Sequence, residues 1–188
     1  MKKLVILSSG FGSNLGAMIE KLHQQHDIEI ALVISDHDSQ SLIRGQKAGI
    51  PTLYLPKNKG IDRAKYDEKL ADVIAAFNPD LIVLSGFMRI LTAGFIERFK
   101  GKIINIHPSL LPKYKGLNTH QRAIDAKDLQ HGTTVHFVDE TLDGGRIIDQ
   151  RAISIDINDD KESLEKKIKT IEHDFYPEVI LRLCEIEK

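Results

Sequence analysis

The sequence has one cysteine, no excess of charge of either sign and no long apolar run. Cys184 cannot form an internal disulfide, which favours a buried apolar thiol and a reducing, cytoplasmic setting. The 26 lysines and arginines balance 27 aspartates and glutamates, and both signs are scattered along the chain. This balance argues against a nucleic-acid or membrane partner and favours small-molecule partners. For the assembly we expect a monomer or a weak homodimer.

No segment approaches the roughly 20 apolar residues that a membrane span needs. The N-terminal apolar run, residues 4–7, stops at Ser8-Ser9-Gly10 and is too short for the core of a signal peptide. A chain of 188 residues can bury a large core as one domain without a metal or a disulfide. We therefore expect a soluble, single-domain protein.

Apolar runs of strand length alternate with segments of helical periodicity up to about residue 110. The expected strands are 4–7, 28–34, 52–55, 81–84 and 103–107, and the expected helices are 15–22, 42–48, 66–77 and 93–99. Because these strands have no polar face, the pattern predicts a parallel sheet covered by helices on both faces.

The pattern changes after residue 113. A polar loop and a short helix at 120–126 precede two strands, 133–138 and 146–155, and the turn Asp143-Gly144-Gly145 between them predicts a partly antiparallel edge. Pro177 interrupts a helical stripe over about 160–187, which predicts two helices or one kinked helix. The fold class is therefore α/β, a doubly wound, mostly parallel sheet.

Two polar residues lie on one face of the strand 103–107. Side chains alternate across a strand, so Asn105 and His107 point the same way, with Cα atoms roughly 6–7 Å apart. Pro108 and Pro112 cannot extend a central strand, so the pair lies where the strand ends. Parallel sheets bind ligands outside these carboxyl ends, which makes the pair a candidate reaction centre.

Asp143 is the expected third member of this centre, in the turn after a strand that carries Thr134 and His136 on one face. A carboxylate beside an imidazole favours its charged form and fixes its orientation. An asparagine amide such as that of Asn105 can stabilise an oxyanion. The set indicates acyl transfer without a protein nucleophile.

Simpler interpretations remain open at this point. A histidine at a strand end is often an ordinary hydrogen-bonded residue, and an aspartate before two glycines is often only a turn former. His107, His120, His131 and His136 lack the spacing and the cysteine partners of a zinc site.

A glycine-rich loop, Ser8-Ser9-Gly10-Phe11-Gly12-Ser13-Asn14-Leu15, lies between the first strand and the first helix. Backbone amides and the positive helix end can hold a phosphate there. Leu15 stands where a dinucleotide fingerprint needs a third small residue, which disfavours an NAD site even though Asp36 imitates the ribose-binding acid. Ser13 and Asn14 could also simply cap the helix.

At these residues the sequence resembles the phosphoribosylglycinamide formyltransferase family, folate-dependent enzymes of purine biosynthesis, over nearly its whole length. The shared motifs are Gly12-Ser13-Asn14-Leu15, Ser85-Gly86-Phe87-Met88-Arg89-Ile90-Leu91, Asn105-Ile106-His107-Pro108-Ser109-Leu110-Leu111-Pro112, His131-Gly132-Thr133-Thr134-Val135-His136 and Leu142-Asp143-Gly144-Gly145. The last three together are specific to enzymes that use 10-formyltetrahydrofolate, including methionyl-tRNA formyltransferases and formyltetrahydrofolate hydrolases.

The resemblance implies a role for each matching residue. Asn105, His107 and Asp143 resemble the catalytic trio, Gly12, Ser13 and Asn14 the phosphate loop, and Glu172 an acid that contacts the same substrate. The implied folate site comprises Arg63, Met88, Arg89, Ile90, Leu91, Asn105, Asp139, Glu140, Thr141, Leu142 and Asp143. Met88, Ile90 and Leu91 could clamp a flat pterin and Arg63 could meet a carboxylate, although core packing at a helix start is an alternative for 88–91.

The resemblance also implies a single formyltransferase domain over 1–188, with a phosphate-binding half (about 1–100) and a catalytic and folate-binding half (about 101–188). The expected reaction moves the formyl group of 10-formyltetrahydrofolate, a cosubstrate, to the terminal amine of N1-(5-phospho-D-ribosyl)glycinamide, with no metal. Asn105 and charged His107 would stabilise the oxyanion, and Asp143 would hold His107 and help to move a proton.

Two alternatives are a 10-formyltetrahydrofolate hydrolase and a nucleotide-binding module without catalysis. Hydrolases of this group usually carry an extra N-terminal domain and the tRNA enzymes an extra C-terminal one. Because the sequence begins with a strand and stops at residue 188, we expect neither of these extra domains.

Overall fold

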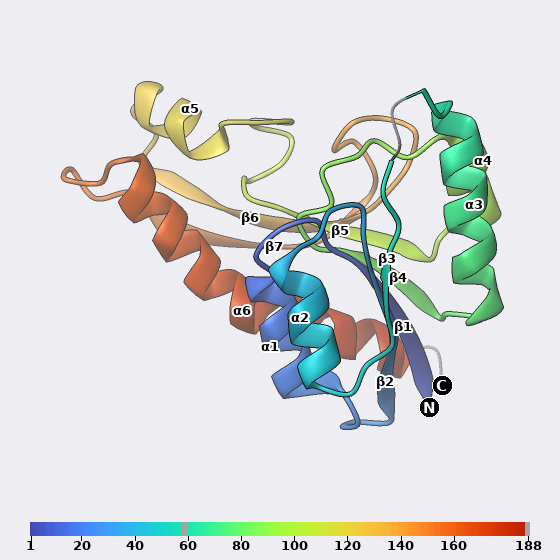
Figure 1. Ribbon diagram of the computed structural model, residues 1–188. Helices are drawn as coiled ribbons and strands as arrows, with labels where there is room; N and C mark the ends of the chain where they lie inside the picture. Colours follow the sequence, from blue (N-terminus) through green and yellow to red (C-terminus); the bar gives the residue numbers. More distant parts are fainter. Residues whose placement is uncertain (58–59, 187–188) are drawn as a thin grey trace.

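The computed structural model describes residues 1–57 and 60–186, and its centre is a single seven-stranded sheet (Figure 1). The strand order is β3-β2-β1-β4-β5-β6-β7. The strands are β1 (Lys2–Leu7), β2 (Ile28–Ser35), β3 (Thr52–Tyr54), β4 (Leu81–Leu84), β5 (Ile103–His107), β6 (Gln130–Phe137) and β7 (Ile147–Ser154). Strands β1 to β5 pair in parallel, whereas β6 pairs antiparallel with β5 and with β7. The predicted mostly parallel sheet with an antiparallel edge is confirmed.

Helices cover both faces of this sheet, as predicted (Figure 1). They are α1 (Ser13–Leu22), α2 (Gln40–Lys47), α3 (Arg63–Ala76), α4 (Ala93–Arg98), α5 (Thr119–Asp125) and α6 (Lys161–Ile186). Helices α1 and α6 pack on one face and α3 and α4 on the other. No helix in the described part of the chain is long and apolar enough to cross a membrane.

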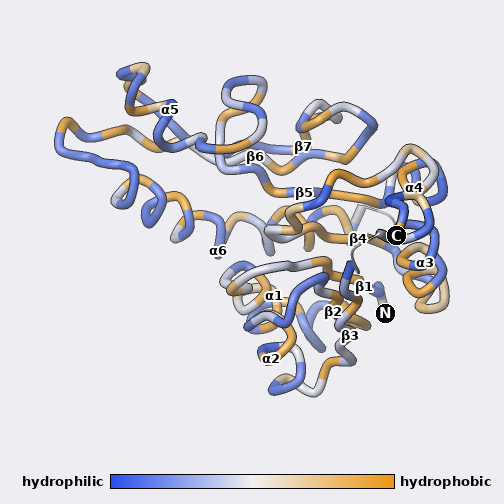
Figure 2. The backbone as a smooth tube through the Cα atoms, turned by 45° about the horizontal axis from the view of Figure 1, so that its top comes forward, coloured by the Kyte–Doolittle hydropathy of each residue, from blue (hydrophilic) through white to orange (hydrophobic). Residues whose placement is uncertain are grey.

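Strand β1 shows how the sequence builds this core. Leu4 and Ile6 face α1 and α6, whereas Val5 and Leu7 face α3 and α4, and all four side chains are fully buried. Burying one such side chain contributes about 1.5–3 kcal/mol. The apolar colour along the central strands in Figure 2 reflects this burial on both faces. The buried strands β1 and β4 therefore hold in place the loops that follow their carboxyl ends.

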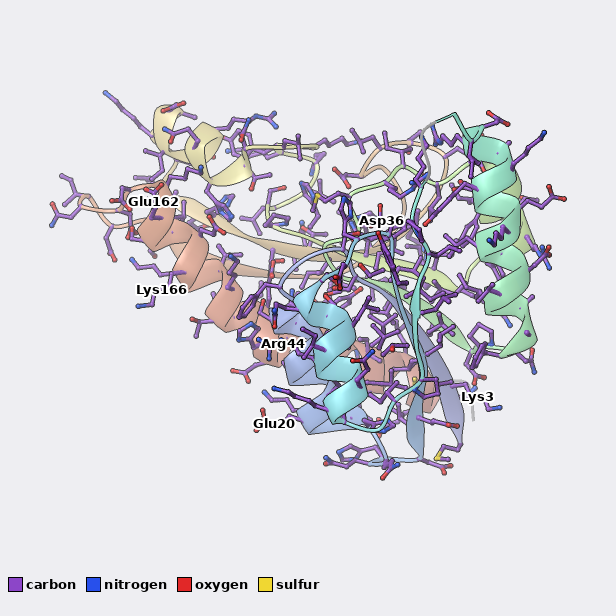
Figure 3. All side chains as sticks on the ribbon, viewed as in Figure 1. Lys3, Glu20, Asp36, Arg44, Glu162 and Lys166 are labelled. Carbon is purple, nitrogen blue, oxygen red and sulfur yellow. The ribbon has the colours of Figure 1, made fainter. Side chains whose placement is uncertain are left out.

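Two elements begin with mostly polar residues, so the apolar pattern of the sequence predicts their first residue too late. Strand β6 begins at Gln130, three residues before the predicted start, because its polar end pairs with β7. Helix α3 begins at Arg63, also three residues early, because Tyr66 is its first large buried side chain. Charged side chains also lie at the start of α6, where Figure 3 shows Glu162 and Lys166.

Helix α6 is a single helix with Pro177 inside it, so of the two predicted arrangements the break into two helices is wrong. Proline has no N–H to donate to the carbonyl one turn earlier, which costs stability in a helix interior. Packing offsets this cost, since Phe175 and Tyr176 are buried against the sheet and the Tyr176 hydroxyl donates to the Leu84 carbonyl at 2.9 Å. Cys184 is buried, as predicted.

Candidate active site

Strand β5 ends at His107 and presents Asn105 and His107 on one side at the carboxyl edge of the parallel strands. Asn105 pairs with His136 across the antiparallel junction with β6, and His107 pairs with Thr134. His107 is 6 % exposed. Asn105, His107, His136 and Asp143 all line one cleft of about 1050 Å³. The structure therefore brings the three predicted catalytic side chains together.

The ring of His107 lies between two acceptors. Its Nε2 is 2.9 Å from the carbonyl oxygen of Tyr114, and its Nδ1 is 3.4 Å from Oδ2 of Asp143. A carbonyl oxygen can only accept, so Nε2 carries a proton. A neutral carbonyl on one side and a carboxylate on the other therefore fix the orientation of the ring.

Asp143 reaches His107 because of an unusual turn. Its own φ is +46°, in the left-handed region that asparagine and aspartate tolerate better than most residues. A Cβ on Gly145 would lie 1.8 Å from the Phe137 carbonyl oxygen, so only glycine fits there. The Gly116 amide also donates to Asp143 Oδ2 at 2.8 Å, which fixes the carboxylate. The turn-former interpretation is thus compatible with a site role.

His136 is a site residue to which the sequence interpretation gave no role. Its Nδ1 donates to the Phe137 carbonyl at 2.8 Å, which leaves Nε2 as an acceptor 3.3 Å from Asn105 Nδ2. Burial lowers the pKa of His136, which keeps the ring neutral. His136 therefore orients the amide of Asn105, a role that depends on the register of β5 and β6 and that the sequence pattern alone did not show.

The glycine-rich loop closes the other end of the cleft. Gly12 precedes α1 with φ +71°, and no side chain caps the helix, so the simple capping interpretation is wrong. Gly12, Ser13 and Asn14 line the cleft with the first amides of α1 nearby. Asp36 bonds Ser9 at 2.6 Å and His37 at 2.9 Å and does not line the cleft, which further disfavours the NAD interpretation.

Glu172 lies on α6 beside this loop, and its side chain is buried. Its Oε2 accepts from Asn14 Nδ2 at 2.9 Å, and its Oε1 lies 3.0 Å from Thr133 Oγ1. Burial raises the pKa of Glu172, since neither partner is a cation. The predicted grouping of Glu172 with the phosphate loop is therefore present in the structure.

The segment 88–91 follows β4 as an irregular loop, not as a helix start. Met88 is 71 % and Ile90 58 % exposed in the cleft wall, so the core-packing alternative is wrong for both, whereas Leu91 is buried. Arg89 stacks over Tyr66 at 3.9 Å. Leu142, 52 % exposed, adds apolar surface. This wall suits a flat apolar ligand.

The remaining predicted folate residues divide into two groups. Asp139, Glu140 and Thr141 line the cleft, and hydrogen bonds from Thr141 lower the pKa of Asp139. Arg63 does not line it: its Nη2 donates to the Leu91 carbonyl at 2.9 Å. The structure thus places Arg63 beside the loop 88–91, outside the cleft wall.

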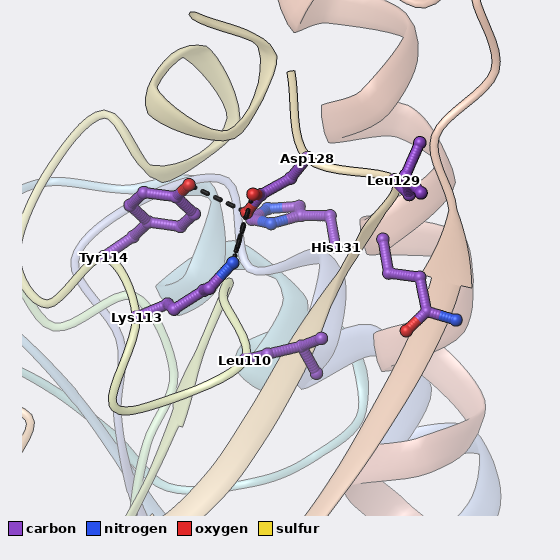
Figure 4. Close-up of a pocket in the computed structure, with 7 residues that line it drawn as sticks. Leu110, Lys113, Tyr114, Asp128, Leu129 and His131 are labelled. Carbon is purple, nitrogen blue, oxygen red and sulfur yellow. Dashed lines mark hydrogen bonds and ion pairs between the residues drawn. The ribbon is translucent and has the colours of Figure 1, made fainter. Parts of the chain in front are cut away.

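A second, smaller pocket of about 660 Å³ lies on the segment after β5 and holds none of the predicted site residues (Figure 4). There Lys113 and Tyr114 both bond the carboxylate of Asp128. Within residues 1–57 and 60–186, no three histidine, cysteine or acidic side chains gather as metal ligands.

The fold and the cleft define the class of protein, and comparison with known proteins gives the family. Residues 2–180 match the model of the formyl transferase family, and the chain belongs to this family. It is 46% identical to the phosphoribosylglycinamide formyltransferase of Haemophilus influenzae, over 96% of this chain and 86% of that protein. It is 41% identical to the enzyme of the same name from Escherichia coli, over 94% and 84%.

Solved structures of the same name share the fold. The enzyme from Coxiella burnetii superposes with a TM-score of 0.91 at 44% identity, covering 96% of this chain and 85% of that chain. The enzyme from Bacillus halodurans gives a TM-score of 0.94 at 33% identity, covering 100% and 97%. The family resemblance seen in the sequence motifs is confirmed.

Proposed function

We infer that the chain transfers the formyl group of 10-formyltetrahydrofolate to the terminal amine of N1-(5-phospho-D-ribosyl)glycinamide. The products are the N-formyl compound and tetrahydrofolate, in de novo purine biosynthesis. One observation carries this inference: a single cleft joins Asn105, His107 and Asp143 to the helix start at Gly12. The names of the relatives at 46% and 41% identity support it.

Asn105 and His107 are proposed to stabilise the oxygen of the formyl group when the amine attacks. That oxygen gains negative charge, and preorganised donors lower the barrier most where charge develops. Asn105 bonds His136 through one N–H and keeps a second N–H for the oxygen. The Nε2 proton of His107 bonds the Tyr114 carbonyl, so donation to substrate requires an exchange of this partner.

Asp143 is proposed to hold His107 and to move one proton, directly or through a water molecule. A new C–N bond forms to the attacking amine and the C–N bond to the folate nitrogen breaks, so one proton passes from the first nitrogen to the second. An α-amine has a pKa near 7.7–8, so a modest base suffices. The 3.4 Å separation between this carboxylate and the His107 ring supports a shared role at one reaction centre.

Gly12, Ser13 and Asn14 are proposed to bind the phosphate of the amine substrate. The open amides of a helix N-terminus, together with its dipole, attract an anion. Glu172, beside Asn14, is proposed to accept hydrogen bonds from the same substrate. A substrate bound at both points would extend along the cleft towards His107.

The folate is proposed to occupy the wall made by Met88, Arg89, Ile90 and Leu91 and the loop 139–143. The exposed apolar side chains Met88 and Ile90 fit a flat ring, and backbone groups of the irregular loop can bond its edge. Arg63, although outside the cleft wall, is exposed beside Leu91 and can meet a carboxylate at the end of a long ligand.

A hydrolase that releases formate from the same folate is the alternative that the phosphate loop disfavours. The two are separated by mixing the protein with 10-formyltetrahydrofolate, with and without phosphoribosylglycinamide, and following loss of the formyl group. We expect rapid loss only with the amine. Equal loss without it would make the protein a hydrolase and overturn the proposal.

The setting of the enzyme is also a proposal. We place it in the cytoplasm, as a single domain over residues 1–188, where strands of both halves pair in one sheet between β4 and β5. We propose a monomer or a weak homodimer, with small molecules as its partners and no role for nucleic acid. Sedimentation at micromolar concentration would test the assembly.

A further inference from the structure

A buried hydrogen-bond chain runs from the glycine-rich loop to the end of β5. Asn14 Nδ2 donates to Glu172 Oε2 at 2.9 Å. The hydroxyl oxygen of Thr133 lies 3.0 Å from Glu172 Oε1 and 3.1 Å from the carbonyl oxygen of His107. Thr133 is fully buried on β6, and Glu172 is 6 % exposed, at the wall of the cleft. The chain thus joins the proposed phosphate loop to His107.

The hydroxyl of Thr133 has one proton and two acceptors within reach. The His107 carbonyl already accepts from the Ser109 amide at 2.8 Å, whereas an ionised Glu172 is the stronger acceptor. The proton therefore points to Glu172 when that group is charged and has no other donor at Oε1. Protonation of Glu172 removes the charge that attracts the Thr133 proton, and a substrate donor at Oε1 competes with Thr133 for that oxygen. Either change favours donation from Thr133 to the His107 carbonyl.

We propose that Thr133 is a positioning residue that couples binding of the amine substrate at Glu172 to the placement of His107. This rests on the proposed function, because it needs a substrate that contacts Glu172. When substrate donates to Glu172, Thr133 turns to the His107 carbonyl and fixes the end of β5. Binding of the amine substrate thereby strengthens the hold on His107 at the oxyanion position.

Two substitutions separate this role from simple core packing. Thr133→Val keeps the shape of the side chain but removes the hydroxyl, whereas Thr133→Ser keeps the hydroxyl and removes a methyl group. Coupling predicts that the valine variant loses about tenfold in kcat, the cost of a hydrogen bond to a neutral carbonyl, and that serine stays within about threefold of wild type. A packing role predicts the reverse order.

Thr52→Val on β3 is the matched control, since it makes the same change in a strand remote from the cleft. We expect its kcat and both KM values to equal those of wild type. Thermal unfolding of each variant corrects the rates for the folded fraction. A valine variant that is folded and fully active would overturn the coupling.

A spectroscopic readout tests the coupling without turnover. The ¹⁵N signals of the His107 ring are followed while phosphoribosylglycinamide is added without folate. We expect a shift in wild type and in Thr133→Ser, and a smaller shift in Thr133→Val although the substrate still binds. Equal shifts in all three would refute the inference, whereas a wild-type enzyme that neither binds nor formylates this amine would refute the proposed function itself.

Discussion

Oδ2 of Asp143 lies 3.4 Å from Nδ1 of His107 and accepts the amide of Gly116 at 2.8 Å. One carboxylate oxygen thereby joins the end of β5, the segment after it and the turn before β7. Asp143 lies 27 positions after Gly116 in the sequence, and its carboxylate is only 11% exposed. Its charge therefore acts on His107 with little screening by water.

Replacing Asp143 with asparagine tests this arrangement. Asp143→Asn keeps the size of the side chain but removes its charge and its ability to take up a proton. We expect kcat to fall by about 100-fold or more and its pH dependence to change. Asp38→Asn, an exposed change outside the cleft, is the control. Unchanged turnover and an unchanged pH profile in Asp143→Asn would remove Asp143 from the mechanism.

The pairing of Asn105 with His136 predicts a non-additive double mutant. Asn105→Ala removes the proposed oxyanion donor and should cost on the order of 3 kcal/mol of transition-state stabilisation. His136→Phe keeps a ring but removes the acceptor for Asn105 Nδ2, and we expect kcat to fall about tenfold with both KM values nearly unchanged. In the double variant the second change should add little, because the hydrogen bond that it removes is to Asn105, whereas Asp143 Oδ1 lies farther away, at 3.9 Å. Additive losses in single-turnover rates would show that His136 acts independently.

A substitution at Gly12 tests whether the glycine-rich loop binds the substrate phosphate. A Cβ at Gly12 would lie 2.8 Å from Ser41 Oγ, and its φ of +71° strains any other residue. We expect Gly12→Ala to raise the KM for phosphoribosylglycinamide about tenfold and to leave the KM for the folate unchanged. Gly49→Ala is matched for strain, with φ +72° and open space around it, and should lose only stability. Equal KM values in the two variants would argue against a phosphate at Gly12.

The reaction centre could be predicted from sequence because its geometry is local. Strand alternation places Asn105 and His107 on one face, and prolines end the strand. The turn at Asp143 also follows from two adjacent glycines. Family resemblance supplied the expectation that Glu172 and the loop 12–14 contact one substrate, since no local pattern links Asn14 and Glu172, 158 positions apart.

Other features depend on tertiary contacts that a sequence pattern does not carry. The role of His136 follows from its register opposite Asn105 across β5 and β6. Arg63 lies outside the cleft wall because α3 begins earlier than its apolar periodicity and directs the guanidinium to the Leu91 carbonyl. Helix α6 continues through Pro177 because packing of Tyr176 outweighs the lost hydrogen bond.

The contact between the half-buried His120 and the buried His131 predicts how stability depends on pH. His120 Nδ1 lies 3.1 Å from His131 Nε2, and burial together with the neighbouring ring lowers the pKa of His131 to about 4. In the unfolded chain this pKa is about 6.5, so between pH 6.5 and 4 the unfolded state binds more protons. The free energy of unfolding should therefore fall on acidification, by up to about 3 kcal/mol from His131.

Urea unfolding at pH 7 and pH 5 measures this dependence. We expect His131→Asn to be less stable than wild type at pH 7, because it breaks the contact with His120, and to lose less stability between the two pH values. Some loss should persist, since burial also lowers the pKa of His120. His26→Asn, which replaces an exposed histidine, should keep the wild-type difference. If His131→Asn and wild type lost equal stability on acidification, the burial of a neutral His131 would not be a source of the acid sensitivity of this fold.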